Sequence, residues 1–224
     1  MMTKAMIVFN VRAVIFDMDG VITNTMAYHM KAWREVLTRY DVFVSKNDIY
    51  KREGQKGINS VEEIFADYNK PFDLKLGQKI LLEKEELFKG IVKERFIIGS
   101  RGFLKGLKHR GFKLALVTGT ARHEVRKMLP DQIFDLFDAV VCGCDVQNGK
   151  PHPEPYLMAL RKLSLSAKQA VVIENAPFGI QSSKTAGIRC LAIETSLPKK
   201  FLGKADAVFS SFSDITSKAI FELA

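Results

Sequence analysis

The strongest constraint on the fold is a short apolar segment, Ala-Val-Ile-Phe at residues 13–16, which runs directly into Asp17-Met18-Asp19-Gly20. An apolar run without alternation is typical of a parallel strand that is buried on both faces. Asp17 then lies at the carboxyl end of that strand and Asp19 on the turn after it, where open α/β sheets bind their ligands. Such a pair of carboxylates can act as nucleophile and proton carrier, or can share a cation.

The second half of the chain alternates short apolar segments with amphipathic ones. The apolar segments predict strands at residues 113–117, 139–141, 170–173, 190–193 and 207–209. Strands that alternate with helices predict an α/β fold with a parallel, doubly wound (Rossmann-like) sheet. Residues 1–11 are expected to form only an extension before the first strand, and a helix from about residue 213 is expected to end the chain. Because no Gly-x-Gly-x-x-Gly opens a helix, dinucleotide binding has no support.

A long helical region separates the first strand from the others. Residues 23–95 are amphipathic at helical spacing and hold no strong strand pattern, apart from a polar loop at 53–60 in which Ser60 and Glu63 are expected to form a capping box. We therefore predict an all-helical cap domain at 23–95, inserted into a core domain made of residues 1–22 and 96–224. A helical lobe over the carboxyl end of a strand can act as a lid.

Charge and cysteine content narrow the class of protein. The 224 residues include 34 Lys and Arg against 25 Asp and Glu, but these basic residues are scattered and show no aromatic–basic RNA signature, so no nucleic-acid partner is expected. Cys142, Cys144 and Cys190 do not form a disulfide framework, which favours reduced thiols and a cytoplasmic protein. No apolar run reaches membrane-spanning length, so no membrane partner is expected. We expect a monomer or a weak dimer.

Polar residues recur where the predicted strands end. They are Asp17 and Asp19, Thr118, Lys150 in the loop before Pro151, and the pair Glu174 and Asn175. A nucleophile, an acid/base, a hydroxyl donor and a fixed cation make a set that suits phosphoryl transfer, in which positioning and positive charge do most of the work. The candidate ligands are hard oxygens, which match Mg²⁺.

Four sequence motifs, in order, resemble those of the haloacid dehalogenase superfamily, in the branch with a small helical (C1-type) cap. They are Phe16-Asp17-Met18-Asp19-Gly20-Val21-Ile22, Val117-Thr118-Gly119-Thr120, Lys150-Pro151-x-Pro153, and Val172-Ile173-Glu174-Asn175-Ala176-x-x-Gly179-Ile180. The match covers nearly the whole chain.

The resemblance implies an enzyme with an aspartyl-phosphate mechanism. Asp17 attacks phosphorus, and Asp19 protonates the leaving oxygen and then deprotonates the attacking water or hydroxyl. Lys150 neutralises charge. The implied phosphoryl-binding groups are Thr118, Gly119 and Thr120, and the implied Mg²⁺ ligands are Asp17, the Asp19 carbonyl, Glu174 and Asn175. Family members that cleave carbon–halogen bonds lack the second aspartate, so Asp19 favours phosphate esters.

Residues 19–33 are similar to the opening of the β-phosphoglucomutase branch, including His29 and Trp33, the latter expected to pack within the cap. Lys84 falls where a cap lysine of that branch lies, and His29, Lys56 and Lys84 are therefore candidate substrate contacts. The cap loop of the mutase carries an arginine, whereas residues 54–60 here hold only Lys56. Because lysine does not reproduce the bidentate fork of arginine, we expect a phosphatase for a small phosphorylated metabolite, a sugar phosphate by preference. A phosphosugar mutase is the alternative.

Asn175 stands where the family usually has aspartate. Its amide offers a carbonyl oxygen but no charge, so weaker metal binding is expected unless Glu174 compensates. This departure allows a second alternative, a non-catalytic relative that only binds phosphorylated metabolites.

Overall fold

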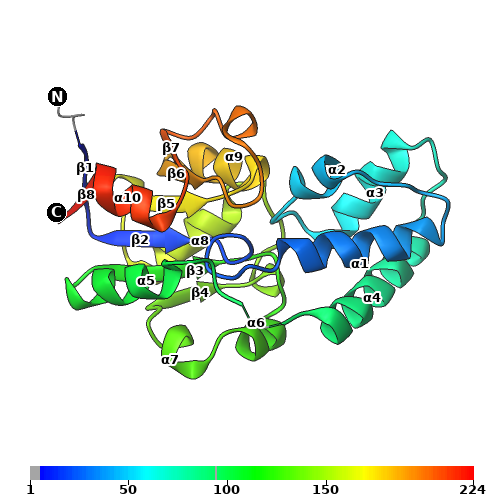
Figure 1. The fold of residues 1–224 in the computed structure, drawn as a ribbon, viewed down its shortest axis with the longest axis horizontal. Helices are drawn as coiled ribbons and strands as arrows, with labels where there is room; N and C mark the ends of the chain where they lie inside the picture. The colour runs from blue at the N-terminus through cyan, green and yellow to red at the C-terminus, as the bar shows by residue number, and fades with distance from the viewer. Residues whose placement is uncertain (1–5, 94) are drawn as a thin grey trace.

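Strand β2 (Ala13–Phe16) lies in the middle of a parallel sheet whose order is β4-β3-β2-β5-β6-β7. A computed structural model describes residues 6–93 and 95–224 (Figure 1). The other strands of this sheet are β3 (Lys113–Val117), β4 (Ala139–Val141), β5 (Ala170–Glu174), β6 (Arg189–Ile193) and β7 (Ala207–Phe209). The predicted doubly wound parallel sheet is confirmed, and its central strand has no exposed residue.

Successive residues of the strands pack on opposite faces of the sheet, as the pleat requires. On one face, Val14 and Phe16 belong to a core with α5 (Ser100–His109) and α10 (Phe212–Lys218). On the other face, Ala13 and Ile15 belong to a core with α8 (Glu154–Leu163) and α9 (Pro177–Thr185). Helices therefore cover both faces and leave the carboxyl ends of the strands as the accessible edge (Figure 1).

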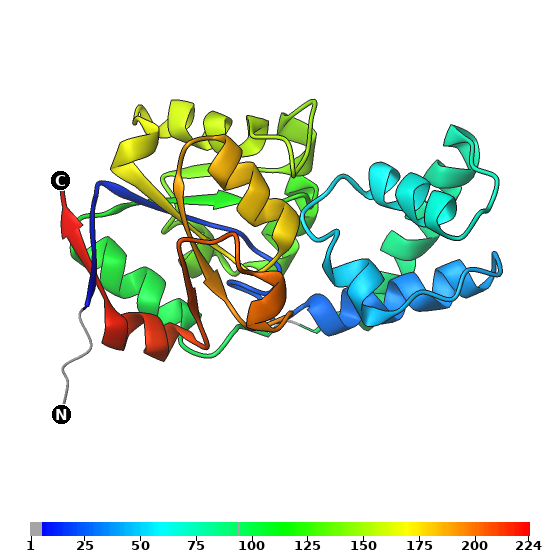
Figure 2. The ribbon, with the colours of Figure 1, turned by 90° about the horizontal axis from the view of Figure 1, so that it is seen from above.

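A separate helical unit lies beyond that edge (Figure 2). It consists of α1 (Met26–Thr38), α2 (Lys46–Tyr50), α3 (Gly57–Asp67) and α4 (Leu74–Ile91). Helix α4 packs against both α1 and α3. The boundaries of the cap domain at residues 22 and 95 stay a prediction.

The remaining short helices lie around the sheet. They are α6 (Arg122–Met128), α7 (Asp131–Phe134) and three single 3₁₀ turns at Gly143–Asp145, Ala167–Gln169 and Lys199–Phe201. Within the described ranges, no helix combines the length and the apolar character that a membrane span needs.

The expected capping box at Ser60 is wrong. Helix α3 begins three residues earlier, at Gly57, and the Ser60 hydroxyl donates a hydrogen bond to Gln55 Oε1 at 3.0 Å. A capping box is instead formed at the start of α2, where Ser45 and Asp48 bond reciprocally. The sequence pattern did not predict the start of α3, because the Ser60 hydroxyl bonds to Gln55, outside the helix.

The two ends of the described chain form a small sheet that the sequence did not predict. Strand β1 (Ile7–Val11), expected as an extension, pairs in parallel with β8 (Ala219–Leu223), expected as part of a helix. The rings of Phe9 and Phe221 stack with centroids 5.6 Å apart. Pairing between residues about 210 positions apart leaves no local signal in either segment. Residues 1–5 of the predicted extension lie outside the described residues.

We predict that Phe221→Ala lowers the free energy of unfolding by about 3–5 kcal/mol, because a buried aromatic ring leaves a cavity. Phe221 is 3% exposed and contacts the rings of Phe9, Phe103 and Phe112. Urea denaturation measures the change. Leu223→Ala, in the same strand but 55% exposed, is the control and should change stability by less than about 0.5 kcal/mol. Equal losses in the two variants would contradict this account of β8.

Candidate active site

Lys150 joins the carboxyl ends of two neighbouring strands. Its Nζ donates to Asp17 Oδ1, just after β2, at 2.6 Å, and to Glu174 Oε1, at the end of β5, also at 2.6 Å. A third, longer hydrogen bond of 3.3 Å goes to the carbonyl of Val117, the last residue of β3. The side chain of Lys150 is only 1% exposed. Burial alone would lower its pKa, but the two carboxylates reverse this effect and hold the pKa above its usual value.

The environment of Asp17, unlike that of Lys150, disfavours the charged form of the side chain. Burial raises its pKa to about 8, although the ammonium of Lys150 opposes this, and the charges of Glu174 and Asp19 raise the pKa further. Two carboxylates share the ammonium of Lys150 and a third, that of Asp19, acts on Asp17, so the cluster carries an excess of negative charge. A cation placed among them would offset that repulsion.

Glu174 is held by the protein at both of its oxygens. Oε1 accepts hydrogen bonds from Lys150 and from the Tyr156 hydroxyl at 2.7 Å, and Oε2 accepts from the backbone N–H groups of Asn175 and Ala176. A Cβ on Gly179 would lie 1.7 Å from Glu174 Oε1, which explains the glycine of the fourth motif. These bonds leave little room for the predicted direct contact of Glu174 with a metal.

Two buried oxygens near this cluster have no hydrogen-bond partner among the described residues: Asp17 Oδ2 and Asn175 Oδ1. The amide of Asn175 is oriented by Ser196, because its Nδ2 donates to Ser196 Oγ at 2.8 Å. Buried oxygens without partners are rare and call for a ligand. The pair fits a hard cation such as Mg²⁺, which accepts carboxylate and amide oxygens and keeps several waters. In the described residues, no three His, Cys, Asp or Glu side chains gather around one point, so amide, carbonyl and water oxygens would complete such a site.

Asp19 accepts hydrogen bonds from three directions. Thr25 and His29 Nε2, the latter at 3.3 Å, donate to Oδ1, and the Thr120 hydroxyl donates to Oδ2 at 3.3 Å. Burial alone would raise the pKa of Asp19, but His29 and Thr25 outweigh burial and lower it. Thr25, which immediately precedes α1, was not predicted as a site residue.

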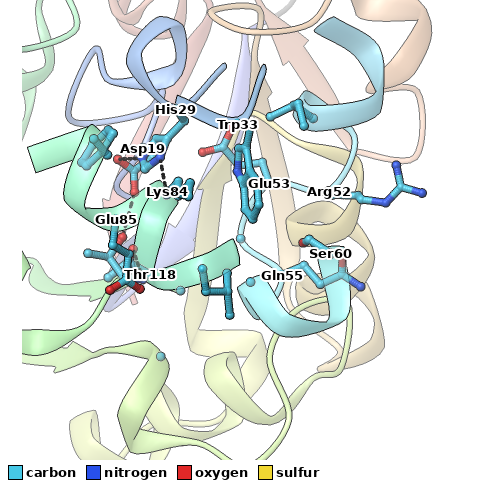
Figure 3. A pocket seen from close by; sticks show the side chains of 18 of the residues that line it. Asp19, His29, Trp33, Arg52, Glu53, Gln55, Ser60, Lys84, Glu85 and Thr118 are labelled. Atoms are coloured by element: carbon cyan, nitrogen blue, oxygen red, sulfur yellow. Dashed lines mark hydrogen bonds and ion pairs between the residues drawn. The ribbon is translucent and has the colours of Figure 1, made fainter. Parts of the chain in front are cut away.

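His29 and Lys84 continue this chain of hydrogen bonds into the cap. Lys84 Nζ lies 3.1 Å from His29 Nδ1, and the imidazole stacks on Phe88 with ring centroids 4.0 Å apart. Burial lowers the pKa of both groups, and in His29 the charge of Lys84 adds to the effect. A neutral imidazole that carries its proton on Nε2 fits both contacts. Figure 3 shows Asp19, His29 and Lys84 side by side.

A cavity of about 230 Å³ lies between this cluster and the cap. Its core wall includes Asp17, Asp19 and the turn Thr118-Gly119-Thr120, which the sequence singled out as site candidates. Its cap wall includes the predicted His29 and Lys84, and also residues that were not predicted as site residues: Trp33, Arg52, Glu53, Gln55, Ser60 and Glu85. The cavity is smaller than common ligand pockets of roughly 300–1,000 Å³, which favours a small substrate.

Lys56 is not among the described residues that line the cavity, and its role as a substrate contact stays a prediction. Its Nζ donates to the backbone carbonyls of Val146 at 2.9 Å and of Gln147, both on the core. The side chain therefore joins the cap loop to the core. Gly149 makes room for this contact, since a Cβ there would lie 2.8 Å from Lys56 Cγ.

The residues that support or line the site without having been predicted also include Tyr156, Ser196 and Glu53. Tyr156 and Ser196 follow no motif, and only the fold brings them to Glu174 and Asn175. Glu53 lies in the polar cap loop, and an acid beside Gly54 in that loop was the available sequence signal.

The sheet, the helical insertion and the cluster at the strand ends define an enzyme with a Rossmann-like α/β core whose site lies under a helical cap. The family model described as haloacid dehalogenase-like hydrolase matches residues 14–193. The chain belongs to this family.

Several relatives are similar over most of their length. A phosphorylated carbohydrates phosphatase of Thermotoga maritima is 35% identical over 185 residues, covering 79% of this chain and 82% of the relative. The β-phosphoglucomutase of Bacillus subtilis is 29% identical over 217 residues and 94% of each chain. The crystal structure of a β-phosphoglucomutase from Clostridium difficile superposes with a TM-score of 0.80 at 26% identity, covering 93% of this chain and 96% of that one.

We predict that Lys56→Met lowers kcat/KM for every substrate by the same factor of about ten. The substitution removes a contact worth roughly 1.5 kcal/mol, and this contact stabilises closure of the cap and not recognition of the substrate. Steady-state assays with at least three substrates measure the factor. Lys75→Met, at an exposed position in α4, is the matched control and should change nothing. A changed order of preference among the substrates would return Lys56 to substrate binding.

Proposed function

We propose that the protein is a Mg²⁺-dependent phosphatase that hydrolyses a small phosphorylated metabolite, a sugar phosphate by preference, through a phosphoaspartyl intermediate on Asp17. One observation carries this proposal: Asp17 lies in a cavity under the cap, with Oδ1 held by Lys150 at 2.6 Å and Oδ2 without a partner among the residues that the structure describes. The T. maritima relative, whose name is phosphorylated carbohydrates phosphatase, supports the substrate class.

In the first step, the Asp17 carboxylate attacks phosphorus, so that an oxygen–phosphorus bond forms while the ester bond breaks. Lys150 cannot move away from Asp17, since Glu174 and Tyr156 fix the other side of the cluster. A cation that is already in position costs no reorganisation when charge develops on the phosphoryl group. Thr118 and the amide of Gly119 line the place where the phosphoryl oxygens would lie.

Asp19 handles the proton in both steps. It enters the first step protonated, gives this proton to the leaving oxygen and becomes ionised, and in the second step it takes a proton from the water that attacks the phosphoaspartate. Hydrogen bonds from Thr25 and His29 stabilise its ionised form, which is the form that the second step needs. Lys84 holds the imidazole of His29 in the tautomer that donates to Asp19.

Asp17, the Asp19 carbonyl and Asn175 would hold Mg²⁺, and Glu174 would act as a positioning residue for Lys150 and for the backbone of Asn175. When bound, the ion would reduce the repulsion between the carboxylate of Asp17 and a dianionic phosphate. The hydrogen bond from Asn175 Nδ2 to Ser196 turns the carbonyl oxygen of this amide away from the Ser196 hydroxyl. Asn175, although uncharged, would therefore still offer an oxygen to the ion.

A phosphosugar mutase is the second candidate. The pair of His29 and Lys84 beside Asp19 and the 29% identity to the β-phosphoglucomutase of B. subtilis favour it. A mutase must also hold the second phosphate of a bisphosphate. Arg52 and Lys84 are the Lys and Arg side chains among the described lining residues, and both already bond to protein groups, which favours the phosphatase.

We predict that the protein with Mg²⁺ releases inorganic phosphate from sugar phosphates, and that Asp17→Asn reduces kcat by about a thousandfold or more because an amide is not a nucleophile. The assay includes β-glucose 1-phosphate with a trace of glucose 1,6-bisphosphate, and follows phosphate and glucose 6-phosphate in the same tube. Unchanged circular dichroism shows that the variant is folded. Glucose 6-phosphate without phosphate would establish the mutase, and retained activity in Asp17→Asn would refute the mechanism.

We predict that Asn175→Asp tightens Mg²⁺ binding by about tenfold, since a charged ligand adds roughly 1.5 kcal/mol of interaction. Isothermal titration calorimetry with MgCl₂ measures the affinity without any substrate. Asn59→Asp, at an exposed position of α3, adds the same charge far from the cluster and is the control. Equal affinities for wild type and Asn175→Asp would mean that Asn175 is not a ligand.

A further inference from the structure

A second cavity, of about 270 Å³, lies where the cap joins the core. Both connections between the two units line it, Thr23 and Thr25 before α1 and Val92, Lys93 and Arg95 after α4. The two connections are bonded to each other, since the N–H of Asn24 donates to the carbonyl of Arg95 at 2.8 Å. Any movement of the cap would therefore change the shape of this space, which we call the hinge cavity.

Basic side chains predominate around the hinge cavity. Of its ten described lining residues four are basic and one is acidic: Lys89, Lys93, Arg95 and Lys127 against Glu124. Lys89 Nζ lies 3.0 Å from Glu124 Oε1. The side chains of the other three bases form no ion pair with any residue that the structure describes. Charges of one sign around a partly enclosed space raise the local concentration of ions of the opposite sign, so the hinge cavity should attract an anion.

The rest of the wall is mainly apolar. Phe88, Val92 and Met128 contribute apolar surface to it. The hydroxyls of Thr23 and Thr25 are directed into the core, where they donate to the carbonyl of Met18 at 3.2 Å and to the carboxylate of Asp19. A ligand would therefore meet cations on one side and hydrocarbon on the other. This combination suits a small organic anion, such as a phosphate monoester with an apolar group.

The hinge cavity is a direct neighbour of the proposed active site. Phe88 and Glu124 line both cavities, and the ring of Phe88 stacks on His29, which bonds to Asp19. Thr25 lines the hinge cavity and bonds to Asp19 directly. Asp19 itself does not belong to the described lining of the hinge cavity. A ligand there could thus act on the active site without occupying it.

The cations of the hinge cavity come from both units. Lys89 belongs to α4 of the cap, whereas Lys127 belongs to α6 of the core. An anion between these two side chains would join the cap to the core, as the pair of Lys89 with Glu124 already does. Such a ligand would bind the closed arrangement more tightly than an open one, and this difference in affinity is what shifts a conformational equilibrium.

We propose that the hinge cavity is a second binding site, for a small organic anion of the phosphate monoester type, and that its occupation holds the cap closed. The site goes beyond the proposed phosphatase activity, because it takes a ligand that is not turned over. Opening of a cap often limits the release of product, so a ligand that keeps the cap closed should lower kcat.

Phenylphosphonate is the probe for binding, since it is an anion with an apolar ring and has no ester bond to hydrolyse. Isothermal titration calorimetry with MgCl₂ present should show a binding event that Lys127→Glu weakens by at least about tenfold, because the charge is reversed. Lys105→Glu makes the same charge change at an exposed position of α5 and should leave every event as it is.

Lys93→Met is the second variant and should weaken the same event about tenfold, because a charge-assisted contact is lost. Affinities that neither Lys127→Glu nor Lys93→Met changes, or an equal loss in Lys105→Glu, would overturn the proposal. So would the absence of any binding event in the wild type.

Inhibition of phosphate release tests the link to the cap, and this part rests on the proposed phosphatase activity. Phenylphosphonate should both lower kcat and raise KM of the wild type, since it also competes for the active site. In Lys127→Glu it should only raise KM. Purely competitive inhibition of the wild type would overturn the link between the hinge cavity and closure. Because the calorimetry needs no turnover, a protein that releases no phosphate would refute the proposed function and leave the binding site intact.

Discussion

The buried ammonium of Lys150 is the interaction on which the site depends. Asp17 and Glu174 each lie 2.6 Å from this ammonium, and Lys150 itself belongs to a loop outside β2 and β5. A buried charge is tolerable only with partners of opposite charge and further hydrogen bonds. Tyr156 and two backbone N–H groups supply these bonds through Glu174. The cluster therefore fixes three segments of the core to one another at the edge where substrate binds.

Close approach of the cap to this cluster depends on residues without side chains. A Cβ on Gly54, whose φ is +76°, would lie 2.6 Å from Cδ of Lys150, and a Cβ on Gly119 would lie 3.2 Å from the carbonyl oxygen of Gly54. Glycine at both positions lets the cap loop lie directly on the catalytic residues. Lys56 then holds the loop against the core through two backbone carbonyls. The loop that lines the cavity is therefore also the loop that joins the cap to the core.

The charged side chains of the loop between α2 and α3 point in different directions. Lys56 and Arg52, the bases of the loop that could bind an anion, are directed to the core and to Glu63 and Asp67. Glu53, an acid, remains directed into the cavity.

The sequence by itself determined the parallel sheet and the polar residues that gather at its edge. The apolar segment before Asp17 and the order of Thr118, Lys150 and Glu174 are local patterns, and parallel strands must bring their carboxyl ends to one edge. Tertiary structure alone decided what depends on distant pairing or on side-chain direction. Strands β1 and β8 pair across nearly the whole chain, and Ser60 bonds to Gln55 instead of capping α3. The sequence of a loop shows which charged residues it contains, but only packing between cap and core determines which of them face the substrate.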